Sequence, residues 1–323
     1  MTRELPAEAL SRADAAWLHL DDRTNHFVVT TLLVLSRPLD IRRLRAAVAA
    51  RLADQPRFSQ RIAEPWLPGL TPRWRPDPDF DLDSHVHRAA LAAPGGPVEL
   101  AELIGDLAGR PIDLQRPLWE CHLVESYQGG AALISRIHHA VGDGAALLEM
   151  LLRLTDVRAG RRLQPAVAAR PPGKRTGAVP AALDLAGKAL ADPAGAVAGA
   201  VRFAGTVAGI TLGPSDPRSP LKAPLGVRKG VAWSRPYRLT EIARFARREL
   251  VTVNDVLTSA IAGAVGRHLG EQIPDAPIHA MVPVNLRGEG PAAPGNQFSL
   301  VMVELPVDAP DARARLLLSL IHI

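Results

Sequence analysis

The chain has 323 residues, of which 47% are hydrophobic and 22% charged, a composition that is typical of globular proteins and excludes a disordered chain. Lysine and arginine outnumber aspartate and glutamate by 38 to 33, and the resulting charge of +5 suits an anionic partner. Because the arginines are scattered and form no basic block, we expect no nucleic acid among the partners. The single cysteine, Cys121, excludes an internal disulfide and a thiolate-rich metal site.

No export or membrane-crossing segment is predicted. The first residues, MTRELPAEALSRADAAW, lack the apolar core of a signal peptide, so we expect a protein of the reducing cytoplasm. Residues 193–213 are long enough to cross a bilayer, but they carry Arg202 at their centre, which costs roughly 2.5 to 3.5 kcal/mol there. We therefore expect a surface or packed helix in this segment.

The first part of the chain alternates helix and strand patterns. Residues 10–17 form a short amphipathic pattern, and the apolar run 27–35 predicts a buried strand. Asp40 is placed to cap a helix whose apolar residues recur at helical spacing, namely Ile41, Leu44, Val48 and Leu52. A second amphipathic helix is predicted from Leu100, Leu103, Ile104 and Leu107. Five prolines in residues 64–80 indicate a loop between them.

A hairpin and a helix are predicted next. Two apolar runs, 118–126 and 131–138, flank the pair Gly129-Gly130, which is typical of a β-hairpin. The sequence HHAVGDG follows the second run directly. A helix is predicted after it from Leu147, Leu148, Leu151 and Leu152.

The rest of the chain repeats the alternation after a linker. Residues 156–226 predict a linker with a small-residue crossover helix over 181–210. Strands are predicted at 231–237, 280–286 and 298–305, and helices from Thr240 and over 253–269. We therefore predict an α/β protein of two lobes with mixed sheets flanked by helices, divided as 1–155, 156–226 and 227–323.

The segment from His138 to Gly144 is the strongest candidate for chemistry. Adjacent side chains of an extended segment point to opposite faces, so the two histidines cannot easily serve one centre. Imidazole is the side chain best suited to proton transfer near neutral pH. Gly142 and Gly144 allow the backbone around Asp143 to turn tightly and a ligand to approach. The alternative is a surface histidine pair beside a Gly-Asp-Gly turn, which is the commoner meaning of so short a motif.

Other chemistries lack their sequence signatures. The chain has no G-x-S-x-G elbow, no phosphate-binding glycine loop and no histidine spacing typical of zinc, so we expect no metal. The remaining possibility is a histidine proton shuttle that uses no protein nucleophile.

HHAVGDG also matches the H-H-x-x-x-D-G signature of the thioester-dependent acyltransferases, a superfamily that includes chloramphenicol acetyltransferase and the condensation domains of peptide synthetases. Further blocks resemble the bacterial wax ester synthase/diacylglycerol acyltransferase family: LSRADAAWL at 10–18, FDLDSHV at 80–86, PLWE at 117–120, LVE at 123–125, TVNDV at 252–256, MVPVNLR at 281–287 and Gly295-Asn296. The resemblance covers residues 10–306, and the order and spacing of its blocks make it specific.

The resemblance implies a chloramphenicol-acetyltransferase-like fold and acyl transfer from acyl-CoA to a hydroxyl group. His139 would be the general base, and His138 would orient the loop. Asp143 would be structural and held by an arginine, for which we expect Arg57. Gly144 would keep the substrate channel open.

The other blocks have structural alternatives. Pro117 and Trp119 are expected to be core residues, since tryptophan offers a large packing surface. Asn254 and Asp255 either bind substrate at the lobe interface or cap the helix that begins there. Asn285 and Arg287 either line the cleft or close a turn.

The implied acyl acceptor is diacylglycerol or a fatty alcohol, and the implied acyl donor is a long-chain acyl-CoA, with no cofactor. We expect a cytoplasmic enzyme, peripheral on a membrane or lipid inclusions, whose second lobe is incomplete because family members continue beyond residue 323. The alternatives are a condensation-type enzyme that uses carrier-bound thioesters and a non-catalytic protein that binds a lipid surface.

Overall fold

The computed structural model describes residues 8–52, 55–63, 71–155, 217–285, 296 and 298–319. These residues form two compact units. The first comprises the described residues up to 155, together with Leu225–Trp233 and Asn296, and the second comprises the rest. The segment 227–233 and Asn296 thus belong to the first unit, although the sequence assigned them to the second lobe. The predicted crossover helix over 181–210 and Arg287 lie outside the described residues.

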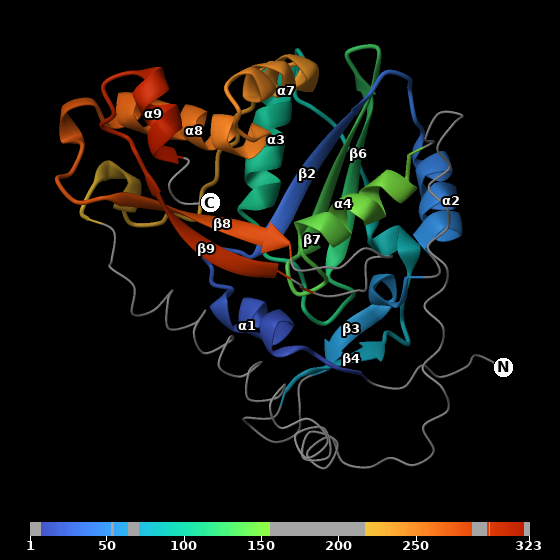
Figure 1. Ribbon diagram of the computed structural model, residues 1–323. Helices are drawn as coiled ribbons and strands as arrows, with labels where there is room; N and C mark the ends of the chain where they lie inside the picture. The colour runs from blue at the N-terminus through green and yellow to red at the C-terminus, as the bar shows by residue number, and fades with distance from the viewer. Residues whose placement is uncertain are drawn as a thin grey trace. The chain divides into compact units, whose positions relative to one another are not determined.

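A mixed four-stranded sheet forms the centre of the first unit (Figure 1). Its strand order is β2 (Val28–Leu35), β7 (Gly130–His138), β6 (Trp119–Tyr127) and β5 (Val86–Ala89). The β2–β7 and β6–β7 pairs are antiparallel, and the β5–β6 pair is parallel. Strand β7 lies between two neighbours and every one of its residues is buried, including the polar Ser135, Arg136 and His138.

The predicted hairpin joins β6 to β7, but its turn differs from the prediction. Tyr127 pairs with Gly130, so Gln128 and Gly129 are the turn residues, both at positive φ. Gly130 is instead the first residue of β7. A Cβ atom there would lie 1.8 Å from the Leu35 carbonyl oxygen, so the close approach of β2 requires glycine.

Helices cover both faces of this sheet. Helices α2 (Ile41–Leu52) and α4 (Gly144–Arg153) contribute to the core on one face, where Leu44 and Leu147 pack with Leu133 and Ile137 of β7. Helix α3 (Pro97–Ala108) covers the other face with Leu100, Ile104 and Leu107. The four apolar residues predicted for α2 are all buried, and Asp40 accepts hydrogen bonds from the first N–H groups of that helix, as predicted.

The first unit contains a second, three-stranded sheet, and Arg57 contacts all of its strands. The strands are ordered β1 (Glu8–Ala9), β4 (Arg73–Pro76) and β3 (Gln60–Ala63). The Arg57 guanidinium lies 2.8 Å from Glu8 Oε2 and 2.5 Å from Gln60 Oε1, and its carbon lies 4.6 Å from the centre of the Trp74 ring. Arg57, from the short helix η1 (Pro56–Phe58), therefore contacts all three strands.

Within the described residues, the second unit contains a pair of antiparallel strands and three α-helices. They are α7 (Leu239–Arg248), α8 (Val253–Leu269), β8 (Ile278–Asn285), β9 (Phe298–Leu305) and α9 (Ala312–Ser319). Strands β8 and β9 are antiparallel over their whole length. The apolar core of the second unit, which includes Ala262, Leu269 and Ile278, is small.

The predicted strand at 231–237 is wrong. These residues belong to no β-ladder, and Trp233 and Tyr237 are exposed. Alternating apolar residues favour an extended backbone, but a strand also requires a neighbour that offers its N–H and C=O groups. No strand in the described part of the chain pairs with this segment.

Candidate active site

The end of β7 holds the first of the two motif histidines. His138 is the last residue of the strand, opposite Val28 of β2, and its N–H donates to the Leu118 carbonyl at 3.0 Å. Pro117 and Trp119 flank that carbonyl and are buried, and the Trp119 indole donates to the Phe58 carbonyl. The Pro-Leu-Trp block thus packs in the core beside the strand end.

The hydrogen bonds of His138 use both of its ring nitrogens. Nδ1 accepts from the Ala140 N–H at 3.0 Å, so the proton is on Nε2, which donates to Asp21 Oδ2 at 3.0 Å. Burial lowers the pKa of His138, against the opposing hydrogen bond and charge of Asp21. His138 is therefore a neutral, fully buried residue that shapes the turn.

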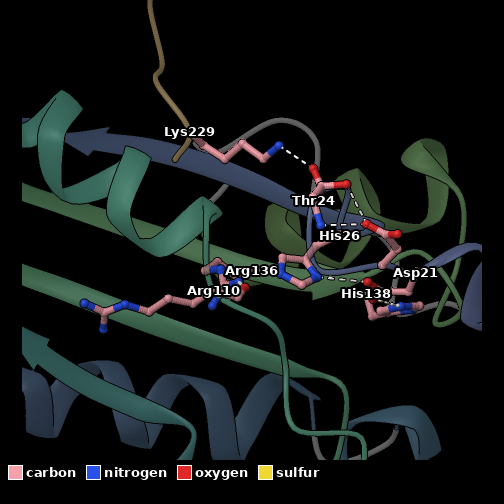
Figure 2. A network of polar contacts seen from close by, with 8 residues as sticks. Asp21, Thr24, His26, Arg110, Arg136, His138 and Lys229 are labelled. Atoms are coloured by element: carbon pink, nitrogen blue, oxygen red, sulfur yellow. Dashed lines mark hydrogen bonds and ion pairs between the residues drawn. The ribbon is translucent and has the colours of Figure 1, made fainter. Parts of the chain in front are cut away.

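Asp21 connects His138 to a second histidine (Figure 2). Its Oδ1 accepts from His26 Nδ1 at 2.9 Å while Oδ2 accepts from His138. Lys229 holds the same loop from a distant part of the sequence, because its Nζ donates to the Thr24 carbonyl at 2.6 Å. The loop between α1 and β2 is thus held at Asp21 by His138 and at Thr24 by Lys229.

An ion pair joins Arg136 of β7 to Glu120 of the neighbouring strand β6. The Arg136 guanidinium is nearly fully buried and donates to Glu120 and to the Arg110 carbonyl. Burial by itself raises the pKa of Glu120, but the hydrogen bond from His122 and the charge of Arg136 together lower it to about 2.

His139 follows the strand and is partly exposed, so it faces a different environment from His138. Its N–H donates to the Phe27 carbonyl at 2.8 Å, and its ring stacks on Trp17 of helix α1 (Arg12–Leu20) at 5.0 Å between centroids. Burial lowers the pKa of His139, although Asp143 and the Gly142 carbonyl oppose the shift. A neutral imidazole at pH 7 is what a general base requires.

Asn296 is a site residue that the sequence did not assign. Its Nδ2 donates to the His139 carbonyl at 2.8 Å and to Asp14 Oδ1 at 2.6 Å. The sequence signal for Asn296 is its place in the Gly295-Asn296 block, and the resemblance alone implies no role for that block. Asp14 and His139 lie 282 and 157 positions away from it, so no local pattern could have predicted the contacts.

Asp143 and Gly144 form the start of α4. Asp143 is the N-cap residue, and its Oδ1 accepts from the Ala146 N–H at 3.0 Å. The expected ion pair with Arg57 is wrong, because the Arg57 guanidinium is directed to the small sheet instead. Gly144 is exposed, and a Cβ atom there would meet no atom within 4 Å. Among the described residues, open space therefore adjoins the end of the HHAVGDG turn.

The predicted site residues Asn254, Asp255 and Asn285 lie in the second unit, and their surroundings there are as follows. Asp255 is buried and forms a capping box with Thr252, which is the N-cap of α8, whereas Asn254 is exposed. Asn285 ends β8, and its side chain lies outside the described residues. Among the residues that the structure describes, no group of three or more histidine, cysteine or acidic side chains could hold a metal ion.

Cys121, the single cysteine of the chain, is buried in this unit. Burial raises the pKa of its thiol to about 11, so the reactive thiolate is not formed at neutral pH. The chemistry available at this turn is therefore proton transfer by His139.

A family model described as the wax ester synthase/diacylglycerol acyltransferase catalytic domain matches residues 10–257, well over half of the chain. The chain belongs to this family. Its match includes the block at 10–18, the HHAVGDG turn and the TVNDV block at 252–256.

Relatives and solved structures agree with the family. A Mycobacterium tuberculosis protein named as a probable diacylglycerol O-acyltransferase is 31% identical over an alignment of 322 positions, which covers 95% of this chain and 68% of that protein. Another M. tuberculosis protein, also named for this activity, is 30% identical over 80% of this chain and 57% of its own length. The chain thus spans a little over half to two thirds of the length of these curated relatives.

The predicted fold is confirmed by structural likeness. The wax ester synthase/diacylglycerol acyltransferase from Marinobacter aquaeolei matches 98% of this chain and 70% of its own, with a TM-score of 0.60 and 24% identity. The first condensation domain of the calcium-dependent antibiotic synthetase matches 99% of this chain and 75% of its own, with a TM-score of 0.61 and 18% identity.

Proposed function

We propose that this family member is an O-acyltransferase that moves a long-chain acyl group from acyl-CoA to the hydroxyl of diacylglycerol or a fatty alcohol. The observation that carries the proposal is His139: a neutral, partly exposed imidazole at the end of a buried strand, beside open space at Gly144. Membership of the family supplies the reaction class.

The reaction requires only a base and a bound thioester. His139 takes the proton of the acceptor hydroxyl, and the oxygen attacks the thioester carbonyl carbon. The tetrahedral intermediate then collapses with cleavage of the C–S bond. His139 returns the proton to the departing CoA thiolate, so the products are an ester and CoA. The buried, protonated Cys121 supports direct transfer over an acyl-enzyme.

The acyl donor separates this proposal from a condensation-type reaction. The structural likeness to a condensation domain shows the fold alone, whereas the family match and the names of the relatives favour acyl-CoA. An assay that offers acyl-CoA and acyl-carrier protein side by side distinguishes the two donors.

We also propose that the protein works at a membrane or lipid-inclusion surface, because both acceptors are water-insoluble lipids. No helix within the described residues is long and apolar enough to cross a bilayer. Flotation with vesicles that contain diacylglycerol tests this surface binding. A non-catalytic lipid-binding protein would float as well, but would show no transfer.

The decisive experiment compares two histidine variants of the full chain. His139→Ala should lose at least about a hundredfold in transfer from palmitoyl-CoA to diacylglycerol or hexadecanol, because the general base is removed. His19→Ala, on the exposed end of α1, is the matched control and should retain full activity. Unchanged transfer by His139→Ala would overturn the proposal, and offering both acceptors shows which is preferred.

A further inference from the structure

We propose that Asn296 is a positioning residue, which sets the orientation of His139 by holding its backbone carbonyl and the helix that carries Trp17. This inference rests on the proposed function, because it assigns His139 as the base. Asn296 itself touches neither ring nitrogen of His139, so its role is indirect.

The amide of Asn296 uses both of its hydrogens. One N–H of Nδ2 donates to Asp14 Oδ1 at 2.6 Å and the other to the His139 carbonyl at 2.8 Å, while the backbone N–H also reaches Asp14 Oδ1 at 3.2 Å. Both acceptors are oxygens that cannot donate. The flipped amide would place an oxygen against each of them, so only the observed orientation is possible.

The two acceptors of Asn296 lie on the two segments whose rings stack on each other: Asp14 is on the helix that carries Trp17, and the carbonyl is that of His139 itself. Asp14 is buried in the first turn of α1, and the same helix carries Trp17, whose ring stacks on His139. Asn296 therefore joins the helix that bears Trp17 to the turn that bears His139. The ring stack, the bond from the His139 N–H to the Phe27 carbonyl and the bond between Asp21 and His138 also hold this region, and Asn296 adds the described side-chain link that reaches both α1 and the His139 carbonyl.

The hydrogen bonds of Asn296 explain why this position suits asparagine. Aspartate has the same shape but no N–H group, and its charge would face Asp14. Glutamine has the donors but is longer by one methylene group. The link to Asp14 is a hydrogen bond to a charged group, and such bonds are stronger than neutral ones.

The first part of the test uses Asn296→Ala and Asn296→Asp in the full chain. We expect kcat for acyl transfer to fall about tenfold or more, with the larger loss in Asn296→Asp, while KM for acyl-CoA changes by less than about twofold. A variant that retains kcat, or that loses activity only through KM, would overturn the proposal.

A double variant separates the two bonds of Asn296. Asp14→Asn combined with Asn296→Asp restores a donor–acceptor pair between positions 14 and 296, but provides no donor to the His139 carbonyl. We expect it to recover the Tm lost in Asn296→Asp and not the kcat. Recovery of kcat as well would show that the carbonyl contact is dispensable and would overturn the proposal.

A spectroscopic readout keeps the proposal independent of turnover. In protein labelled selectively at its ten histidines, the His139 ring proton should be shifted by the Trp17 ring current, and the signal is assigned by its loss in His139→Ala. Asn296→Asp should move it toward the free histidine position. If the wild type lacks transfer activity but the signal moves, the proposed function fails and the positioning role stands. An unmoved signal would overturn the positioning role.

Discussion

His138 Nε2 lies 3.0 Å from Asp21 Oδ2, although the two residues are 117 positions apart in the sequence. Asp21 is the residue at which α1 ends, and His138 is the residue at which β7 ends. This bond therefore joins the helix that carries Trp17 to the strand that delivers His139. The first histidine of the motif is part of the frame around the base, and both of its nitrogens are occupied.

Removal of Asp21 should destabilise the protein. In Asp21→Ala, the buried Nε2–H of His138 loses its acceptor, which typically costs about 1–3 kcal/mol of folding free energy. Urea unfolding measures this loss, and kcat should fall with it because the turn is no longer fixed. Asp106→Ala, on the exposed face of α3, is the matched control and should change stability by less than about 0.5 kcal/mol. Equal stability of the two variants would contradict the frame role.

A methyl group at Gly144 should reduce activity without weakening the fold. Because a Cβ atom there meets no atom within 4 Å, Gly144→Ala should fold normally, with a gain of up to about 1 kcal/mol from the lost flexibility of glycine. If substrate fills that space, KM should rise or kcat fall. Gly130→Ala is the contrasting variant, since its Cβ would lie 1.8 Å from a carbonyl oxygen and should prevent stable folding. Full activity of Gly144→Ala would place the substrate elsewhere.

The rate of acyl transfer should fall on acidification, and this fall should occur at a lower pH than for an ordinary histidine. A protonated His139 cannot accept a proton, so the rate falls as pH decreases through its pKa. Because burial lowers this pKa below the usual 6.5, we expect the midpoint of the acidic limb of kcat/KM to lie below pH 6.5. A limb centred above pH 6.5 would show that His139 is not the titrating base or that its pKa is raised.

Stability should fall in two stages on acidification. Burial lowers the pKa of His138, as of His85 and His87, so the unfolded chain binds more protons than the folded one below about pH 6.5, and stability decreases there. The pKa of Glu120, lowered from 4.5 to about 2, adds a second decrease between these values. Thermal unfolding at a series of pH values measures both stages. Glu120→Gln should reduce the second stage, and the first should persist because it arises mainly from burial of the three histidines.

Arg57 should matter for stability and not for catalysis. Arg57→Met loses the bonds to Glu8 and Gln60 across the small sheet, which we expect to cost about 1–3 kcal/mol in urea unfolding. Because Arg57 does not pair with Asp143, kcat measured well below the Tm should stay within about twofold of the wild type. A large loss of kcat at full folding would restore a link between Arg57 and the catalytic turn.

The local parts of this architecture could be predicted from the sequence. The hairpin, the turn after His138 and the start of α4 each depend on residues within a few positions of one another: apolar alternation, glycines at the turns and Asp143 as a cap. The turn shifted by one residue from the predicted glycine pair, because the approach of β2 required Gly130 within the strand.

The contacts between distant segments could not be predicted in this way. Asp21 and Asn296 reach the catalytic turn through single hydrogen bonds that leave no periodic signal. The expected pairing of Arg57 with Asp143 is wrong for the same reason, since the two residues lie far apart in the sequence and no local pattern specifies the partner of Arg57. The strand expected at 231–237 likewise depended on a neighbour that the local pattern does not specify.

Asp143 caps α4 and His138 is hydrogen-bonded to Asp21, so the structure of the HHAVGDG turn depends on residues outside the turn itself. A loop transplanted into another hairpin would carry the base with it, but neither the helix that Asp143 initiates nor the carboxylate that holds His138. Engineering of a new acyltransferase from this turn would have to import α1, β7 and α4 together. A side chain introduced at the exposed Gly144, by contrast, would leave that frame intact.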